Sequence, residues 1–247
     1  MPAVGGERAY DRSLARRAAA VAGMSALLAG VVVTATDAGG PWSQRLGMTS
    51  ALAPLCGALG TLAAVRIAAA RGELAALAAV GVEPLRAVLG AVLGGSAVGL
   101  LGSAVAASGL ADLGPLFPRP PAARVWVGEG GALHELTLGL RAGPHGELTL
   151  EAPRAAIGAL STGVTTFTLL ALVLAALACP VWVATAPPER SARRAAVGMT
   201  AIVTAVAAFQ GVAAARLPAA ALVVAPLVLL VDVFLRARVS IRNHGRN

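Results

Sequence analysis

The stretch PLRAVLGAVLGGSAVGLLGSAVAAS, residues 84–108, carries a single charge, Arg86, near its start. About 20 consecutive apolar residues are enough for a helix to cross a bilayer. Backbone groups in lipid must find their hydrogen-bond partners within their own segment, which makes such a run helical. Pro84 agrees with this because proline is tolerated at the first position of a helix. The stretch therefore predicts a membrane-spanning helix.

Five further apolar runs predict an α-helical membrane protein with six transmembrane helices. Apolar residues make up 57% of the chain and charged residues 13%, against roughly a quarter charged in soluble domains. Three runs precede a polar stretch and three follow it. The domains are a transmembrane half at 1–108, an insertion at 109–155 and a second transmembrane half at 156–247. The other runs lie at about 18–35, 48–69, 157–184, 195–216 and 217–235.

The first run follows four arginines and ends in Ala35-Thr-Asp-Ala, a pattern shared with cleaved signal peptides. We interpret it as a retained helix, because it is slightly long for a signal and more apolar segments follow. A polar turn at 37–47 places Trp42 where interfacial aromatic residues usually lie. Pro180, inside the fourth run, is expected to kink that helix or open its hydrogen bonds locally.

The polar stretch at 109–155 opens with several prolines and continues with three segments of partial alternation. These are Arg124-Val-Trp-Val-Gly, Leu133-His-Glu-Leu-Thr-Leu-Gly-Leu and Glu147-Leu-Thr-Leu-Glu-Ala. With glycine and proline between them, they predict a small antiparallel β unit. A sheet of this size is marginal in water, so we expect it to pack on a partner subunit or the membrane surface.

The distribution of arginine predicts the orientation of the chain. With six spans, the two termini share one side with the loops after the second and fourth helices. Fourteen arginines lie on that side and six on the other. Cytoplasmic loops carry the excess of positive charge. We therefore expect a bacterial inner-membrane protein with both termini in the cytoplasm and the β unit in the periplasm.

The residues needed for catalysis, cofactors or metals are not arranged in any recognisable motif. All twenty basic residues are arginine, so the chain cannot form a P-loop, whose lysine reaches the phosphates of ATP. His134, His145 and His244 share no ligand spacing, and we interpret the first two as solvent-facing strand residues. Cys56 and Cys179 lie in apolar runs and read as inert. We expect no catalytic site, no cofactor, no metal and no nucleic-acid partner, since the positive charge adjoins apolar runs.

Charged or polar residues within membrane spans are functional candidates by default. Arg66 can extend to the interface, Asp232 can pair with Arg236 one turn later, and Gln210 can hydrogen-bond across helices. We interpret all three as structural. Small residues crowd the second and third spans and predict that these two helices pack closely; they are Gly57, Gly60, Gly90, Gly94, Gly95, Gly99 and Gly102.

The most informative segment, at about 71–81, reads Arg-Gly-Glu-Leu-Ala-Ala-Leu-Ala-Ala-Val-Gly. Glu73 in its first turn suits the helix dipole and Gly81 can end it, so a separate short helix is predicted. Leu74, Ala75, Leu77 and Ala78 would form an apolar face, with Arg71 and Glu73 as its charges. Such a helix either inserts into a groove of an ATPase partner or lies on the lipid headgroups, and composition favours neither.

The residues from Leu55-Cys-Gly-Ala-Leu-Gly through the short helix to Val82-Glu-Pro-Leu-Arg86 resemble the LptF/LptG family of lipopolysaccharide-export permeases. The detailed likeness covers about 50–105, and the plan of three spans, a β region and three spans covers the whole chain. The resemblance implies a permease subunit of an ABC-type exporter, paired with a second permease chain, alike or homologous. A cytoplasmic ABC ATPase dimer would dock on the coupling helix through Arg71, Glu73, Leu74, Leu77, Gly81 and Glu83.

The resemblance further implies that lipopolysaccharide or a similar lipid enters between helices one and five and moves toward the periplasm. The chain departs from the family pattern in two places. Glu83-Pro84 stands where the family has serine or threonine, which alters the expected ATPase contact. The β region is far shorter than a jellyroll, which puts transfer to a periplasmic bridge protein in question. The alternative is a membrane scaffold or assembly subunit that retains the fold without transporting.

Overall fold

A computed structural model of the chain describes residues 4–36, 39–117, 126–129, 131–135, 140–150, 160–185 and 191–244. Within these ranges six helices are long and apolar enough to cross a membrane, as the sequence predicts. A seventh helix, α3 (Glu73–Ala79), is short. The long helices are α1 (Val4–Thr36), α2 (Trp42–Ala70), α4 (Pro84–Ala107), α5 (Thr162–Ala184), α6 (Ser191–Ala213) and α7 (Val224–His244).

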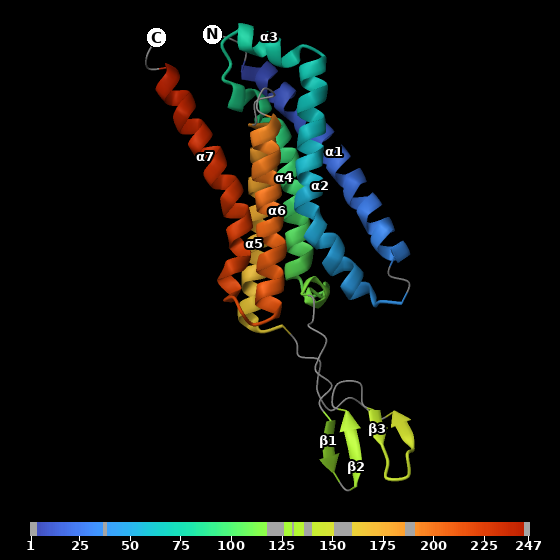
Figure 1. Cartoon of the computed structure of the whole chain (residues 1–247). Helices are drawn as coiled ribbons and strands as arrows, with labels where there is room; N and C mark the ends of the chain where they lie inside the picture. The colour runs from blue at the N-terminus through green and yellow to red at the C-terminus, as the bar shows by residue number, and fades with distance from the viewer. Residues whose placement is uncertain are drawn as a thin grey trace.

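The two ends of the chain lie at the same end of the bundle, as an even number of spans requires. Figure 1 shows the start of α1, the helix α3 and the end of α7 together at one end of the bundle. The strands lie beyond the opposite end. We call the first of these the α3 end.

The second and the last long helix start differently from the prediction. The second long helix begins at Trp42, so residues 42–47, predicted as part of a polar turn, are helical. Pro41 takes an extended conformation directly before it, with φ −65° and ψ 155°, and the Arg45 guanidinium lies 5.4 Å from the centre of the Trp42 ring. The last span starts with a 3₁₀ turn, η3 (Ala219–Val223), before α7.

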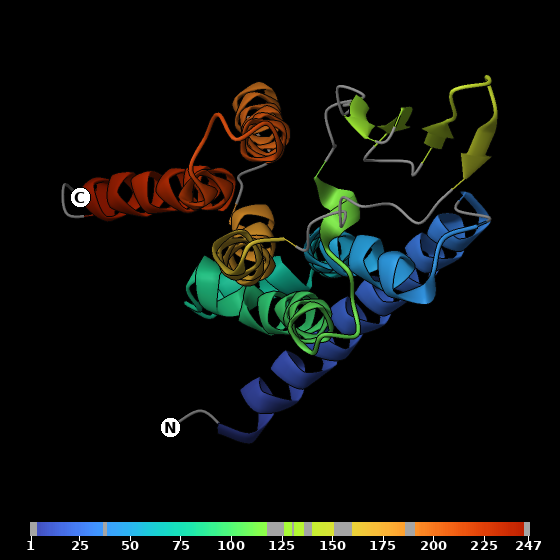
Figure 2. The ribbon, with the colours of Figure 1, turned by 90° about the horizontal axis from the view of Figure 1, so that it is seen from below.

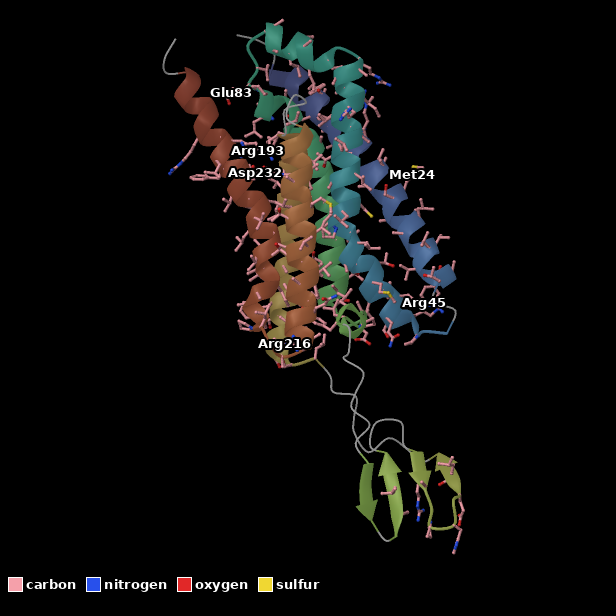
Figure 3. All side chains as sticks on the ribbon, in the orientation of Figure 1. Met24, Arg45, Glu83, Arg193, Arg216 and Asp232 are labelled. Atoms are coloured by element: carbon pink, nitrogen blue, oxygen red, sulfur yellow. The ribbon has the colours of Figure 1, made fainter. Side chains whose placement is uncertain are left out.

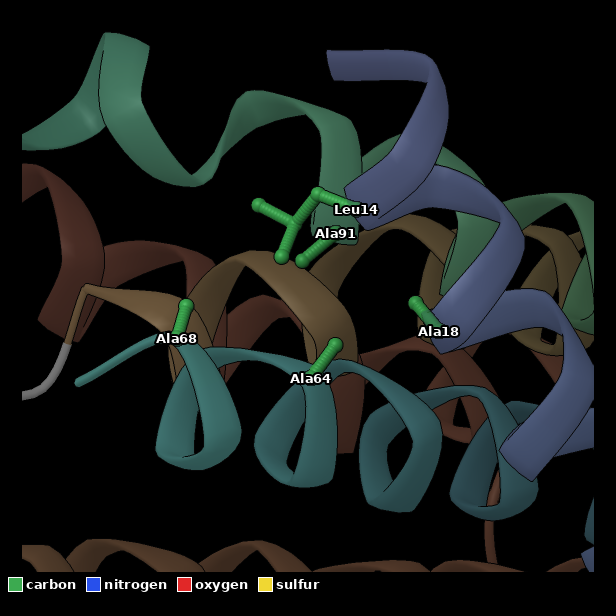
Figure 4. Packing of buried hydrophobic residues seen from close by; sticks show 5 residues of the cluster. All are labelled: Leu14, Ala18, Ala64, Ala68 and Ala91. Carbon is green, nitrogen blue, oxygen red and sulfur yellow. The ribbon is translucent and has the colours of Figure 1, made fainter. Parts of the chain in front are cut away.

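Helix α4 lies in the middle of the N-terminal half and packs against α1, α2 and α5. In the C-terminal half α7 packs against α5 and α6, and η3 contacts all three helices. Seen along the bundle, α1 and α7 lie on opposite sides of this core (Figure 2). Small residues make these contacts close. Near the α3 end one cluster consists of Leu14, Ala18, Ala64, Ala68 and Ala91 (Figure 4).

The predicted close packing of α2 and α4 is confirmed. A Cβ atom on Gly57 would overlap the Gly95 carbonyl, and one on Gly95 would overlap the Gly57 carbonyl. Next to this crossing the fully buried Thr61 hydroxyl lies 3.0 Å from the carbonyl oxygen of Gly57 and 3.2 Å from that of Ala91. The two backbones therefore meet directly, with a hydroxyl bonded at the crossing.

The β unit is an antiparallel sheet of four strands in the order β1-β2-β3-β4. The predicted small antiparallel unit is present, and its three predicted segments supply four described strands, because the middle segment contributes both β2 and the start of β3. The strands are β1 (Trp126–Glu129), β2 (Ala132–Glu135), β3 (Leu140–Ala142) and β4 (Leu148–Leu150). Within the predicted insertion, η1 (Gly114–Leu116) is flanked by Leu113 and Phe117, which are buried in clusters with helix residues.

Candidate docking site at the α3 end of the bundle

The geometry of α3 follows from the glycines on either side of it. Gly72, directly before the helix, has φ +75°, and Gly81 has φ +82°, a region that glycine enters without steric cost. At its end the Val82 N–H donates to the Leu77 carbonyl and the Gly81 N–H to the Ala78 carbonyl, both at 3.0 Å. These two bonds form a Schellman motif. The short helix is therefore a defined element at about the predicted place.

Ion pairs join both flanks of α3 to α1. Arg17 Nη1 lies 3.2 Å from Oε1 and 3.3 Å from Oε2 of Glu73. Arg71 Nη1 is 3.8 Å from the same carboxylate. After α3, Arg86 Nη1 lies 2.8 Å from Oδ2 of Asp11. The structure thus brings Arg71 and Glu73 together, as the sequence suggests, and adds Arg17, whose separation of 56 residues gives no local signal.

The predicted apolar face of α3 is divided between two sides of the helix. Leu74 packs against the cluster of Leu14, Ala18, Ala64, Ala68 and Ala91, and Leu77 is half-buried. Ala75 and Ala78 are exposed with Ala76, Ala79 and Val80. Both predicted leucines are therefore half-buried on the bundle side of the helix, where Glu73 pairs with Arg17 of α1, and their contact with a partner stays a prediction. The exposed surface consists of alanines and Val80, and we call it the α3 face.

Gly81 and Glu83 follow the α3 face and do not form part of the ion-pair cluster. Both are exposed, and Figure 3 shows Glu83 at the α3 end of the bundle. Glu83 is extended, with ψ 140°, directly before Pro84.

A second polar cluster in the C-terminal half surrounds Asp232, which is 5% exposed. Trp182 Nε1 of α5 donates to Oδ2 at 2.9 Å, and Arg193 Nη2 of α6 donates to Oδ1 at 3.0 Å. The predicted pair with Arg236 is present as well. Figure 3 shows Asp232 and Arg193 close together. Side chains of α5, α6 and α7 all bond to the Asp232 carboxylate, so the cluster joins three helices.

The remaining in-span candidates are not brought together. Arg66 and Gln210 are exposed on different helices, which agrees with an interfacial Arg66 and places Gln210 on the surface of the bundle. Among the described residues, no group of three or more histidine, cysteine or acidic side chains could hold a metal ion.

The six spans differ strongly in how far the bundle covers them. In α1 and in α6, only 11% of the apolar 18-residue stretch is buried within the bundle, against 28–50% in the other four spans. Exposed side chains on α6 include Met199, Ile202, Val203 and Val206. These two helices are therefore the spans that the rest of the chain covers least.

A comparison of the chain with models of known protein families finds no match, and a comparison with curated proteins finds none either.

Proposed function

We propose that the chain is the permease subunit of an ABC-type exporter that moves lipopolysaccharide or a similar lipid from the inner membrane toward the periplasm. The observation that carries this proposal is α3, a short capped helix between two spans. Its α3 face is made of small apolar residues at one end of the bundle. A rod with such a face is suited to insertion into a groove of another protein.

The energy would come from a separate cytoplasmic ATPase dimer. The chain has no lysine and so no P-loop of its own. The ion pairs of Glu73 with Arg17 and Arg86 with Asp11 hold α3 against α1. A push on α3 would therefore reach α1 directly, in addition to α2 and α4, which adjoin α3 along the chain.

The cargo path would form with a second permease chain. The resemblance to LptF/LptG permeases implies entry between helices one and five, which correspond to α1 and α6. These are the two least covered spans, as expected of helices that meet cargo or a paired subunit. The excess of arginine at the α3 end supports a cytoplasmic location for that end and for both termini. The sheet of four short strands would then lie in the periplasm, where it could contact a bridge protein.

Affinity purification of the tagged chain in mild detergent, with mass spectrometry of the co-purified proteins, tests the motor. We expect an ABC ATPase with the wild type and a loss of at least about tenfold with Ala79→Arg, which places a large charge on the α3 face. Ala70→Arg is the matched control. Ala70 is also exposed at the α3 end, and arginine suits the last turn of either helix.

A charge exchange separates the two ways in which Glu73 could act. Glu73→Arg breaks the pair with Arg17, and Arg17→Glu combined with Glu73→Arg restores it in reverse. Recovery of the ATPase in the double variant would show that Glu73 acts by holding α3. No recovery would show that the carboxylate itself contacts the ATPase. If no ATPase co-purifies with the wild type, the transport proposal fails and the scaffold alternative replaces it.

A further inference from the structure

One face of α1 carries a group of arginines at the α3 end. Ala9, Arg12, Ser13, Arg16 and Arg17 recur at spacings of three and four residues and so share a face of the helix. Together they line an open depression of about 390 Å³. Arg12, Ser13 and Arg16 are exposed, and Arg17 is half-buried through its contact with Glu73.

The same face continues along α1 as an exposed apolar stripe. The spacing of three and four residues carries on through Ala20, Met24, Leu27, Leu28 and Val31. The exposed fractions are 71% for Met24, 73% for Leu27, 65% for Leu28 and 63% for Val31. Figure 3 shows Met24 on the outer side of α1. The opposite face of the helix is buried through Leu14, Ala18 and Ala22, so this face is the one turned away from the bundle.

The dimensions of the face match one lipid molecule in a single leaflet. A helix rises 1.5 Å per residue, which places Met24 to Val31 about 12 to 22 Å from Arg16 along the axis. One leaflet with its headgroup region is about 20 to 22 Å thick, half of the ~40–45 Å bilayer. An acyl chain that starts near Arg16 would therefore run along the stripe.

The charge of the depression selects the headgroup. Three guanidinium groups line it, and one of them, that of Arg17, pairs with the Glu73 carboxylate. Asp11 is paired with Arg86 instead. Guanidinium forms paired hydrogen bonds with phosphate oxygens, and the Ser13 hydroxyl adds a neutral donor. The net positive charge favours a lipid whose phosphate is not neutralised by its own ammonium group.

We propose that this face of α1 binds an anionic phospholipid, with its phosphate in the depression of Arg12, Ser13, Arg16 and Arg17 and an acyl chain along Met24 to Val31. The site lies on α1 and not on the α3 face, although its apolar stripe is part of the poorly covered surface of α1 that the proposed function assigns to cargo or a paired subunit. It holds whether or not an ATPase docks on α3, so it can fail or stand independently of the proposed function.

Native mass spectrometry of the purified, delipidated full chain tests the site, with phosphatidylglycerol and phosphatidylcholine of identical acyl chains as probes. We expect the wild type to bind phosphatidylglycerol in preference to phosphatidylcholine. Arg12→Gln combined with Arg16→Gln should weaken phosphatidylglycerol binding about tenfold. Arg66→Gln combined with Arg238→Gln is the matched control. It removes the same charge from exposed arginines on α2 and α7, and its binding should stay within about twofold of the wild type.

Three results would overturn the proposal: equal loss in both double variants, equal binding of the two lipids, or full displacement of phosphatidylglycerol by millimolar inorganic phosphate. The last result would mean an anion site without an acyl contribution. Arg12 and Arg16 are exposed, so we expect the double variant to fold, as circular dichroism would show. If the double variant does not fold, the wild type alone tests the proposal. Its preference for phosphatidylglycerol over phosphatidylcholine should disappear at about 1 M salt, where the Debye length is about 3 Å.

Discussion

Asp232 shows how a carboxylate is accommodated within an apolar span. A charge in such a segment is costly unless it is paired, and here two guanidinium groups and an indole N–H surround one buried side chain. The pair with Arg236 is predictable, because a spacing of four residues places both on one helix face. The contributions of Arg193 and Trp182 are not, since they depend on how α5, α6 and α7 rotate against each other.

Asp232→Ala should lower the free energy of unfolding by about 3–5 kcal/mol, because it removes the buried carboxylate that neutralises two guanidinium groups. Arg193→Ala should cost less, since the Arg193 side chain is 50% exposed and Arg236 still neutralises the charge. Thermal unfolding in detergent measures both variants. Equal stability of Asp232→Ala and the wild type would contradict the role assigned to this cluster.

At the scale of elements, the apolar runs predicted every long helix, because length and hydropathy are local properties. Boundaries set by a neighbouring contact were less predictable, as at Trp42, where proline and the interfacial ring start the helix earlier. The direction of the α3 face was also beyond prediction. This short helix has only two leucines among alanines, and the side that turns inward is the one where Glu73 pairs with Arg17 and Leu74 packs against the helix cluster. Likewise the approach of Gly90 and Gly94 to the backbone of α1 has no signal apart from the glycines themselves.

Gly95→Leu should force α2 and α4 apart and destabilise the bundle by about 1–3 kcal/mol, the usual cost of overpacking. Gly23→Leu is the control on another span, because a Cβ at Gly23 meets no atom within 4 Å. Thermal unfolding in one detergent compares the two. The packing described for this crossing would be refuted if both variants unfold at the wild-type temperature.

For the whole molecule, the number of spans and the position of the β unit between the third and fourth long helices follow from the order of apolar and polar segments. The pairing of four strands was harder to predict from the sequence, because strands of three or four residues carry little periodicity. The family relationship, the cargo and the partners remain proposals that rest on a resemblance over about 50–105 and on the geometry of α3.

Cysteine labelling of a Cys56→Ala, Cys179→Ala chain tests the orientation. Ala79→Cys lies on the α3 face and His145→Cys in the β unit, and both native residues are exposed. The arginine excess at the α3 end predicts that an impermeant maleimide labels position 145 in intact spheroplasts and position 79 only after lysis. Labelling of position 79 in intact spheroplasts would reverse the assigned sides of the membrane.

The Arg17 guanidinium belongs to two surfaces at once, since it lines the depression on α1 and holds Glu73. A ligand that engages this group in the depression competes with the Glu73 carboxylate and loosens the start of α3. Thermodynamic reciprocity then requires that anything binding α3 and drawing Glu73 aside changes the affinity of the depression by the same factor. The composition of the surrounding bilayer would in this way act as an effector of whatever docks at the end of the bundle.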